Sequence, residues 1–124
     1  MKVKCLKIIN EFTQQDQEMS AWLTVNKEYN VLAMEVRTNK NFFLLIDDSI
    51  NQAPHLHDAK QFEVVTHGVP SNWVINAGNL EVMTIGPKVW QNLNFWEECY
   101  EGNEAALELY KKEVTIILEE ENSV

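Results

Sequence analysis

A short run of two histidines and an aspartate, His55, His57 and Asp58, is the segment of the chain best suited to metal chemistry. Alternate residues of a strand point to the same side, so the two histidines would share a face, and His67 is a possible third ligand. Zinc catalysis needs three protein ligands and an open position for water. However, the motif HExxH is absent and the segment follows Pro54. We therefore favour exposed loop histidines and expect no bound metal.

Two adjacent carboxylates, Asp47 and Asp48, end the apolar segment FFLLI and form a second candidate site. Such a pair can hold magnesium or bind an arginine side chain. Aspartate also favours turns, because its side chain bonds to nearby backbone N–H groups. We expect an exposed turn here, in which both carboxylates are available to a basic partner.

The segment NLNFWEECYEGNEAAL, residues 92–107, combines aromatic, acidic and thiol side chains. A nucleophilic thiolate needs positive surroundings that lower its pKa, whereas Cys99 is flanked by Glu98 and Glu101. The chain has no GxSxG motif, no P-loop and no Rossmann glycine pattern. We therefore expect no catalytic residues, no cofactor and no enzymatic activity.

The charge of the chain is concentrated near its C-terminal end. The formal net charge is −9, and residues 97–124 hold nine acidic residues against two lysines. Such a surface repels nucleic acid, because phosphate binding needs clustered lysine and arginine. It attracts cationic proteins, although the same charge also keeps a small protein soluble. We expect a protein partner and no nucleic-acid partner.

Charge and expected exposure together define a candidate partner-binding surface. Tryptophan and tyrosine are enriched at the centres of protein interfaces, so Trp96 or Tyr100 is a possible anchor. Packing in the core is the other common role of large aromatic side chains. The candidate residues are Asp47, Asp48, Trp96, Glu98, Tyr100, Glu101 and Glu108.

The first two-thirds of the chain reads as short strands that must position these residues. Apolar alternation or apolar runs over residues 1–9, 27–37, 41–49, 60–67 and 72–85 predict about five strands. Residues 10–22 are polar and predict a loop, and glycine, proline and asparagine predict turns at 67–72 and 76–79. Short antiparallel strands favour a small curled sheet or an SH3-like barrel.

The period of the pattern changes after the segment IGPKVW, residues 85–90. Asn94 can cap a first helix, with Glu97 three positions later as in a capping box. Gly102 is suited to end that helix, and Asn103 can cap a second one. The second helix carries an apolar stripe of Leu107, Tyr110, Val114, Ile117 and Leu118. Strands followed by helices predict a single α+β domain over residues 1–124, mainly β over 1–86 and helical over 87–121.

The sequence shows no clear signal peptide and no clear membrane-spanning segment. No apolar run approaches the roughly 20 residues that span a bilayer, and the N-terminal apolar run is too short for a signal peptide. Cys5 and Cys99 match no CxxC or zinc spacing. We expect a monomeric cytoplasmic protein with reduced thiols and no membrane partner.

The order and style of several segments resemble small bacterial immunity proteins of polymorphic toxin systems, including contact-dependent growth inhibition. The resemblance covers about residues 23–118, and its most specific pieces are KQFEVV, PSNW and FWEECYEGNEAAL. It implies a protein that binds and blocks a cognate toxin domain, often a nuclease with a basic cleft, in the cytosol of the producing cell. It supplies no contact residues.

Two other functions stay open at this point. A small metal-dependent hydrolase would use His55, His57 and Asp58. An SH3-like adaptor would bind peptides through exposed aromatic side chains, and its acidic helix would play no part in binding.

Overall fold

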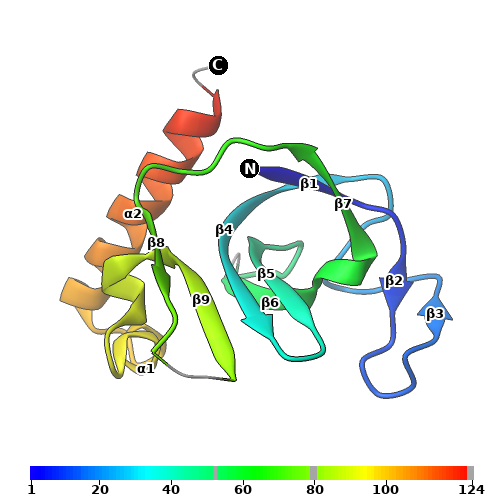
Figure 1. Ribbon diagram of the computed structural model, residues 1–124, viewed down its shortest axis with the longest axis horizontal. Helices are drawn as coiled ribbons and strands as arrows, with labels where there is room; N and C mark the ends of the chain where they lie inside the picture. Colours follow the sequence, from blue (N-terminus) through cyan, green and yellow to red (C-terminus); the bar gives the residue numbers. More distant parts are fainter. Residues whose placement is uncertain (52, 79–80, 123–124) are drawn as a thin grey trace.

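The computed structural model describes residues 1–51, 53–78 and 81–122, and it has an α+β fold. A mostly antiparallel sheet curls around its own core without closing into a barrel, and two α-helices follow it (Figure 1). The predicted curled antiparallel sheet with two C-terminal helices is therefore confirmed. The SH3-like barrel is not formed, because β6 and β7 remain as separate ends of the strand order.

The described residues form nine strands, which is more than the five expected. The main sheet has the order β6-β5-β4-β1-β7, with β1 (Lys2–Cys5), β4 (Glu28–Arg37), β5 (Asn41–Ile46), β6 (Pro54–Asp58) and β7 (Phe62–Thr66). Strand β9 (Val82–Pro87) pairs with β4 and also carries β8 (Trp73–Asn76). A separate hairpin is made by β2 (Ile8–Ile9) and β3 (Asp16–Gln17), so the predicted loop over 10–22 contains one short strand.

Two 3₁₀ helices and two α-helices connect and follow the described strands. They are the 3₁₀ helices η1 (Ala59–Gln61) and η2 (Lys88–Gln91) and the α-helices α1 (Phe95–Tyr100) and α2 (Glu104–Asn122). The histidine segment forms strand β6, so its prediction as a loop is wrong. The predicted turn over 76–79 lies partly outside the described residues.

Strand β4 is long and belongs to two parts of the sheet. Its first half pairs with β1 and its second half pairs with β9. The register against β5 shifts between Val31 and Ala33, which leaves Leu32 as the extra residue of a β-bulge. Consequently Val31 and Leu32 are both buried, in two different clusters. The simple alternation predicted along this segment therefore fails at the bulge.

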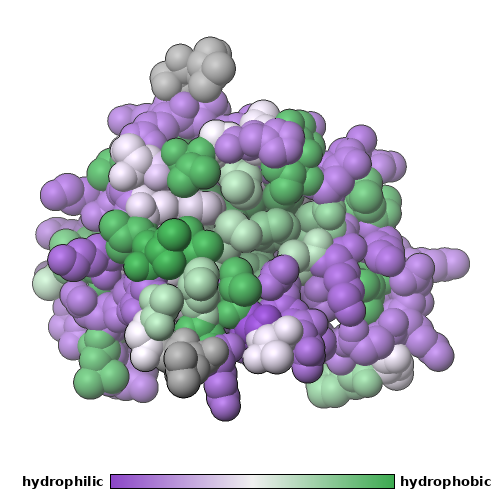
Figure 2. All heavy atoms as spheres, viewed as in Figure 1, coloured by the Kyte–Doolittle hydropathy of each residue, from purple (hydrophilic) through white to green (hydrophobic). Residues whose placement is uncertain are grey.

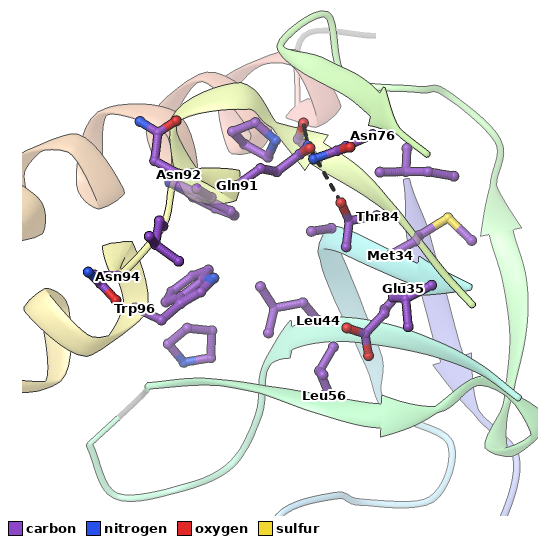
Figure 3. A pocket seen from close by; sticks show the side chains of 18 of the residues that line it. Met34, Glu35, Leu44, Leu56, Asn76, Thr84, Gln91, Asn92, Asn94 and Trp96 are labelled. Atoms are coloured by element: carbon purple, nitrogen blue, oxygen red, sulfur yellow. Dashed lines mark hydrogen bonds between the residues drawn. The ribbon is translucent and has the colours of Figure 1, made fainter. Parts of the chain in front are cut away.

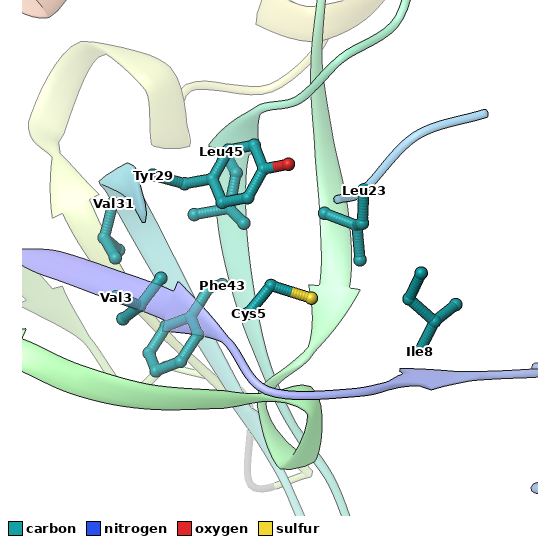
Figure 4. Close-up of a cluster of buried hydrophobic side chains, with 8 residues drawn as sticks. All are labelled: Val3, Cys5, Ile8, Leu23, Tyr29, Val31, Phe43 and Leu45. Atoms are coloured by element: carbon teal, nitrogen blue, oxygen red, sulfur yellow. The ribbon is translucent and has the colours of Figure 1, made fainter. Parts of the chain in front are cut away.

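Two hydrophobic clusters lie on either side of β4 and β5. The first lies inside the curled sheet and comprises Val3, Cys5, Ile8, Leu23, Tyr29, Val31, Phe43 and Leu45 (Figure 4). The second lies beneath the helices and comprises Leu32, Leu44, Trp90, Phe95, Ala106, Val114 and Ile117. Each buried aliphatic or aromatic side chain contributes about 1.5–3 kcal/mol. The two strands therefore join a sheet core to a helix core.

The two α-helices differ in how they begin. Asn94 adopts a left-handed conformation, with φ 66°, and its side chain makes no capping hydrogen bond, so the predicted capping box is wrong. Asn103 Oδ1 accepts a hydrogen bond from the Ala106 N–H at 3.0 Å, as predicted. Gly102 follows α1 with φ 83°, which suits a glycine stop. Within the described ranges, no helix is long and apolar enough to cross a lipid bilayer.

Acidic side chains connect α2 to the N-terminus and to the loop between β7 and β8. The α-amino group of Met1 lies 2.8 Å from Glu121 Oε2, and the Ser71 N–H donates to Glu120 Oε1 at 2.7 Å. Asn72 Nδ2 also donates to Glu113 Oε2, at 2.7 Å. The acidic C-terminal segment is therefore not a uniform outer surface, because these three carboxylates bind within the protein.

A close approach of two strands makes Gly86 a sensitive position. A Cβ atom at Gly86 would lie 2.8 Å from Cβ of Ala33, so Gly86→Ala must displace β9 from β4. We expect a loss of about 1–3 kcal/mol in the free energy of unfolding, measured by urea denaturation. Gly68→Ala is the control, because nothing lies within 4 Å of its added Cβ. Equal losses in the two variants would contradict this account.

Candidate functional site

Asp47 is buried, so its prediction as an exposed turn carboxylate is wrong. Its Oδ2 lies 2.8 Å from His55 Nδ1 and 2.8 Å from His57 Nε2, and both ring nitrogens donate because a carboxylate only accepts. Its Oδ1 accepts from the Ser49 N–H at 2.9 Å. Burial alone raises the pKa of Asp47, but the hydrogen bonds from Ser49 and the two histidines lower it more, so the pKa falls below its usual value.

The predicted metal trio is not brought together as a unit. His55 and His57 do share one side of a strand, but the carboxylate that joins them is Asp47. Asp58 instead caps the helix η1, where its Oδ1 accepts from the Lys60 N–H at 2.9 Å. Among the residues that the structure describes, no group of three or more histidine, cysteine or acidic side chains is arranged to hold a metal ion.

Asp48 fastens the loop that precedes β4. Its carboxylate pairs with Lys27 and accepts hydrogen bonds from the hydroxyls of Thr24, at 2.7 Å, and Tyr29, at 2.8 Å. Partial burial alone raises the pKa of Asp48. Its partners, with Lys27 the strongest, lower the pKa by more, so the pKa falls below its usual value. The pKa of Tyr29 rises to about 12, chiefly through burial. Both carboxylates of the predicted pair are thus engaged inside the protein.

A groove of about 800 Å³ lies between α1, η2 and the strands β4, β5, β6 and β9 (Figure 3). We call it the α1 groove. Its lining is largely apolar and, within the described residues, contains no lysine or arginine. The residues used below are Met34, Glu35, Leu44, Leu56, Thr84, Ile85, Trp90, Gln91, Leu93, Trp96 and Tyr100.

Helix α1 presents two aromatic side chains to the groove. Trp96 and Tyr100 are four residues apart, so they lie on the same side of the helix. Trp96 is half-buried, and its ring centroid lies 5.5 Å from that of Trp90. Tyr100 is 69% exposed. Phe95 is therefore the aromatic residue of this segment that is buried in the core. The two candidate anchors, Trp96 and Tyr100, border the groove.

The remaining predicted contact residues lie on α1, on α2 or in the turn between these helices. Glu98, Glu101 and Glu108 are exposed, as expected. The exposed Glu97 and Glu104 lie on the same two helices. We call these five glutamates the acidic patch. The pKa of the nearby Cys99 is raised by burial and by the charge of Glu98, so its thiol stays protonated at neutral pH, as the sequence indicated.

Several groove residues were missed by the sequence analysis. Leu93 is 90% exposed and Leu56 is 39% exposed, although leucine in these positions reads as core. Glu35 lies within an alternating strand and was not considered. For Leu93 a signal was present, since it stands between two asparagines outside the helical pattern. For Leu56 the signal is its position between His55 and His57, because successive residues of a strand point to opposite sides.

Comparisons with known proteins add no further constraint. No protein-family model matches this chain, and no curated protein or solved structure matches it. The assignment of a function therefore rests on the residues and on the geometry described above.

The engagement of Asp48 predicts a specific dependence of stability on pH. Its folded pKa is below the value of 3.8 for an unperturbed group, so its contribution is complete above about pH 5 and is lost as the pH falls through and below 3.8. We expect Asp48→Asn to lower the free energy of unfolding by about 1–3 kcal/mol at pH 7 and by much less at pH 3.

Urea denaturation at the two pH values measures this difference. Asp16→Asn, in the exposed β3, is the control and should change stability little at either pH. An Asp48→Asn variant with the same deficit at pH 3 as at pH 7 would show that the carboxylate charge is not what fastens the loop.

Proposed function

We propose that this protein is an immunity protein that binds and neutralises a cationic toxin domain, with a nuclease as the expected class. It acts by occupying that domain and transforms no substrate. The observation that carries the proposal is that α1 holds two exposed glutamates, Glu97 and Glu98, as well as the groove residues Trp96 and Tyr100. The expected compartment is the cytoplasm of the producing cell.

The acidic patch provides attraction at a distance. Residues 97–108 contain five glutamates and no lysine or arginine, and all five glutamates are exposed. A surface of one sign can raise the association rate of a complementary protein by roughly 10–10³-fold at low ionic strength. Exposed ion pairs add only about 0.2–1 kcal/mol each, so the patch supports fast encounter more than tight binding.

The exposed apolar side chains beside the patch provide the affinity. Leu93 and Tyr100 both border the groove and both project into solvent. Fully covering one large apolar side chain contributes about 1.5–3 kcal/mol. Tyrosine also anchors interfaces because its ring is rigid and its hydroxyl can still form a hydrogen bond. The patch and the rim therefore supply the two components that a tight and fast inhibitor needs.

A peptide-binding adaptor would use the same groove without the acidic patch. The exposed rim residues Leu93 and Tyr100 are compatible with both functions. The hydrolase alternative gains nothing from the geometry, because His55 and His57 are bound to Asp47. The contribution of charge to association is what separates a toxin-binding protein from an adaptor.

Reconstitution with a toxin domain tests the proposal directly. The protein is used as bait in a lysate of its source organism at low salt, and recovered domains are identified by mass spectrometry. Each candidate is then expressed with and without this protein in a laboratory strain. We expect a one-to-one complex with a cationic domain whose expression arrests growth alone but not in the complex. Complexes that leave the growth arrest unchanged would contradict the proposal.

Charge reversal on α1 tests the role of the patch. With that cationic domain as ligand, Glu98→Lys/Glu101→Lys should slow association about tenfold or more at low salt and weaken its dependence on salt. Stopped-flow fluorescence measures both effects.

The matched control is Glu28→Lys/Glu63→Lys, which changes the net charge equally at exposed positions on β4 and β7. This control should change the rate much less. Equal slowing by both double variants would assign the effect to net charge and remove α1 from the interface.

A further inference from the structure

We propose that the α1 groove receives one large apolar side chain of the partner together with a neighbouring lysine or arginine. This inference rests on the proposed function and names the element of the partner that is recognised. Figure 3 shows the groove from close by, with Trp96 and Leu44 on one side and Met34 and Thr84 on the other.

The lining of the groove suits a large apolar side chain, and its volume also leaves room for the residues that flank it. Its volume of about 800 Å³ falls within the range of typical ligand pockets, roughly 300–1,000 Å³. Trp90, Trp96 and Leu44 give it apolar walls. A buried aromatic side chain typically covers about 150–250 Å² and prefers edge-to-face contacts with other rings. The indole walls therefore favour an aromatic or large aliphatic occupant.

The groove is held open by hydrogen bonds between its own elements. The Nε2 of Gln91 donates to the carbonyl oxygens of Gly86 at 2.9 Å and Val74 at 3.2 Å. Its Oε1 accepts from Thr84 Oγ1 at 3.3 Å, the interaction drawn in Figure 3. These contacts fix η2 to β8 and β9. A preformed groove loses little conformational freedom when an occupant enters.

The charges around the groove select a cation. Glu35 is the one acidic residue among the described lining residues, and Figure 3 shows its carboxylate directed toward Leu44 and Leu56. Arg37 Nη2 lies 2.6 Å from Glu35 Oε2, but Arg37 is outside the lining and its guanidinium lies over the ring of Phe42. The Glu35 carboxylate thus already has one cationic partner, and a cation in the groove would be its second.

The helix that borders the groove is also negatively charged. Trp96 is followed by Glu97 and Tyr100 by Glu101, and both glutamates are exposed, although consecutive helix residues face different sides and neither glutamate lines the groove. An occupant with a carboxylate or a phosphate would meet repulsion at this rim. An apolar side chain flanked by lysine or arginine fits both the walls and the charge.

Three indole probes that differ only in charge test this selectivity. They are tryptamine, which is a cation, 3-ethylindole, which is neutral, and indole-3-propionate, which is an anion. Binding is followed by ¹H–¹⁵N NMR through the indole N–H signals of the four tryptophans. Trp90 and Trp96 line the groove, whereas Trp22 and Trp73 do not and serve as internal controls.

We expect tryptamine to shift the signals of Trp90 and Trp96 and to bind roughly threefold or more tightly than indole-3-propionate, as one or two exposed charge contacts allow. Glu35→Gln should reduce that preference. Equal or tighter binding of the anion, shifts confined to Trp22 and Trp73, or the absence of shifts would each overturn the proposal.

Variants of the groove connect this selectivity to the partner. Leu56→Lys places a cation in the groove, and Leu109→Lys is its matched control, since the two leucines are 39% and 40% exposed and Leu109 lies outside the lining. With the cationic toxin domain as ligand, Leu56→Lys should weaken binding about tenfold or more, and Leu109→Lys less than twofold. Leu93→Lys, at a fully solvated rim position, repeats the test if Leu56→Lys does not fold.

The outcomes separate this inference from the proposed function. If charge reversal on α1 slows association while the groove variants bind normally, the acidic patch stands and the groove proposal fails. If tryptamine binds with the expected preference but no cationic toxin domain forms a complex, the groove is a site for another cationic ligand and the proposed function fails.

Discussion

The sharing of β4 and β5 between two cores is the constraint on which the rest of this structure depends. Because the bulge at Leu32 changes the phase of β4, side chains of one strand pack into the curled sheet and also beneath the helices. Asp47 and Asp48 follow the end of β5 and bind different parts of the protein. One carboxylate binds the histidines of β6, and the other holds the loop before β4. The same arrangement leaves the space between β9, β5 and α1 that becomes the groove.

Eight of the nine acidic residues in 97–124 divide into two groups with different roles, and Glu119 belongs to neither. Glu113 and Glu120 accept hydrogen bonds from Asn72 and Ser71 in the loop between β7 and β8, and Glu121 is paired with the α-amino group of Met1. The glutamates of the acidic patch lie at the other end of the helical segment and face solvent. Net charge alone does not distinguish these groups. The distinction matters because a carboxylate that already holds a partner within the protein must give up that hydrogen bond or ion pair to contact another protein directly.

Several exposed apolar residues also fall into two groups, those on the strands β7, β8 and β9 and those that line the groove. Figure 2 shows hydrophobic side chains gathered over β8 and β9 and over β7, with hydrophilic side chains around them. Exposed apolar residues on these strands include Val64, Val65, Val74, Ile75 and Met83. The groove differs from these surfaces because it is concave, has fixed hydrogen-bonded walls and lies beside a charged helix. That combination is what makes it a specific candidate for recognition.

Much of the fold could be predicted from local patterns, whereas the site could not. The strand-then-helix order, the stop at Gly102 and the cap at Asn103 depend on neighbouring residues, and all three are present. The burial of Asp47 depends on two histidines that arrive from the next strand, and the bulge depends on the register of β5. The groove requires four strands and two helices to meet. The spacing of residues along the chain does not predict that these elements come together.

Amide hydrogen exchange of this protein, alone and bound to the cationic toxin domain, tests the central claim most directly. The account predicts that binding protects residues 92–101 and strand β6, which together border the groove, while the amides of β1 and β7 exchange unchanged. Protection confined to β1 and β7, with α1 unaffected, would contradict it.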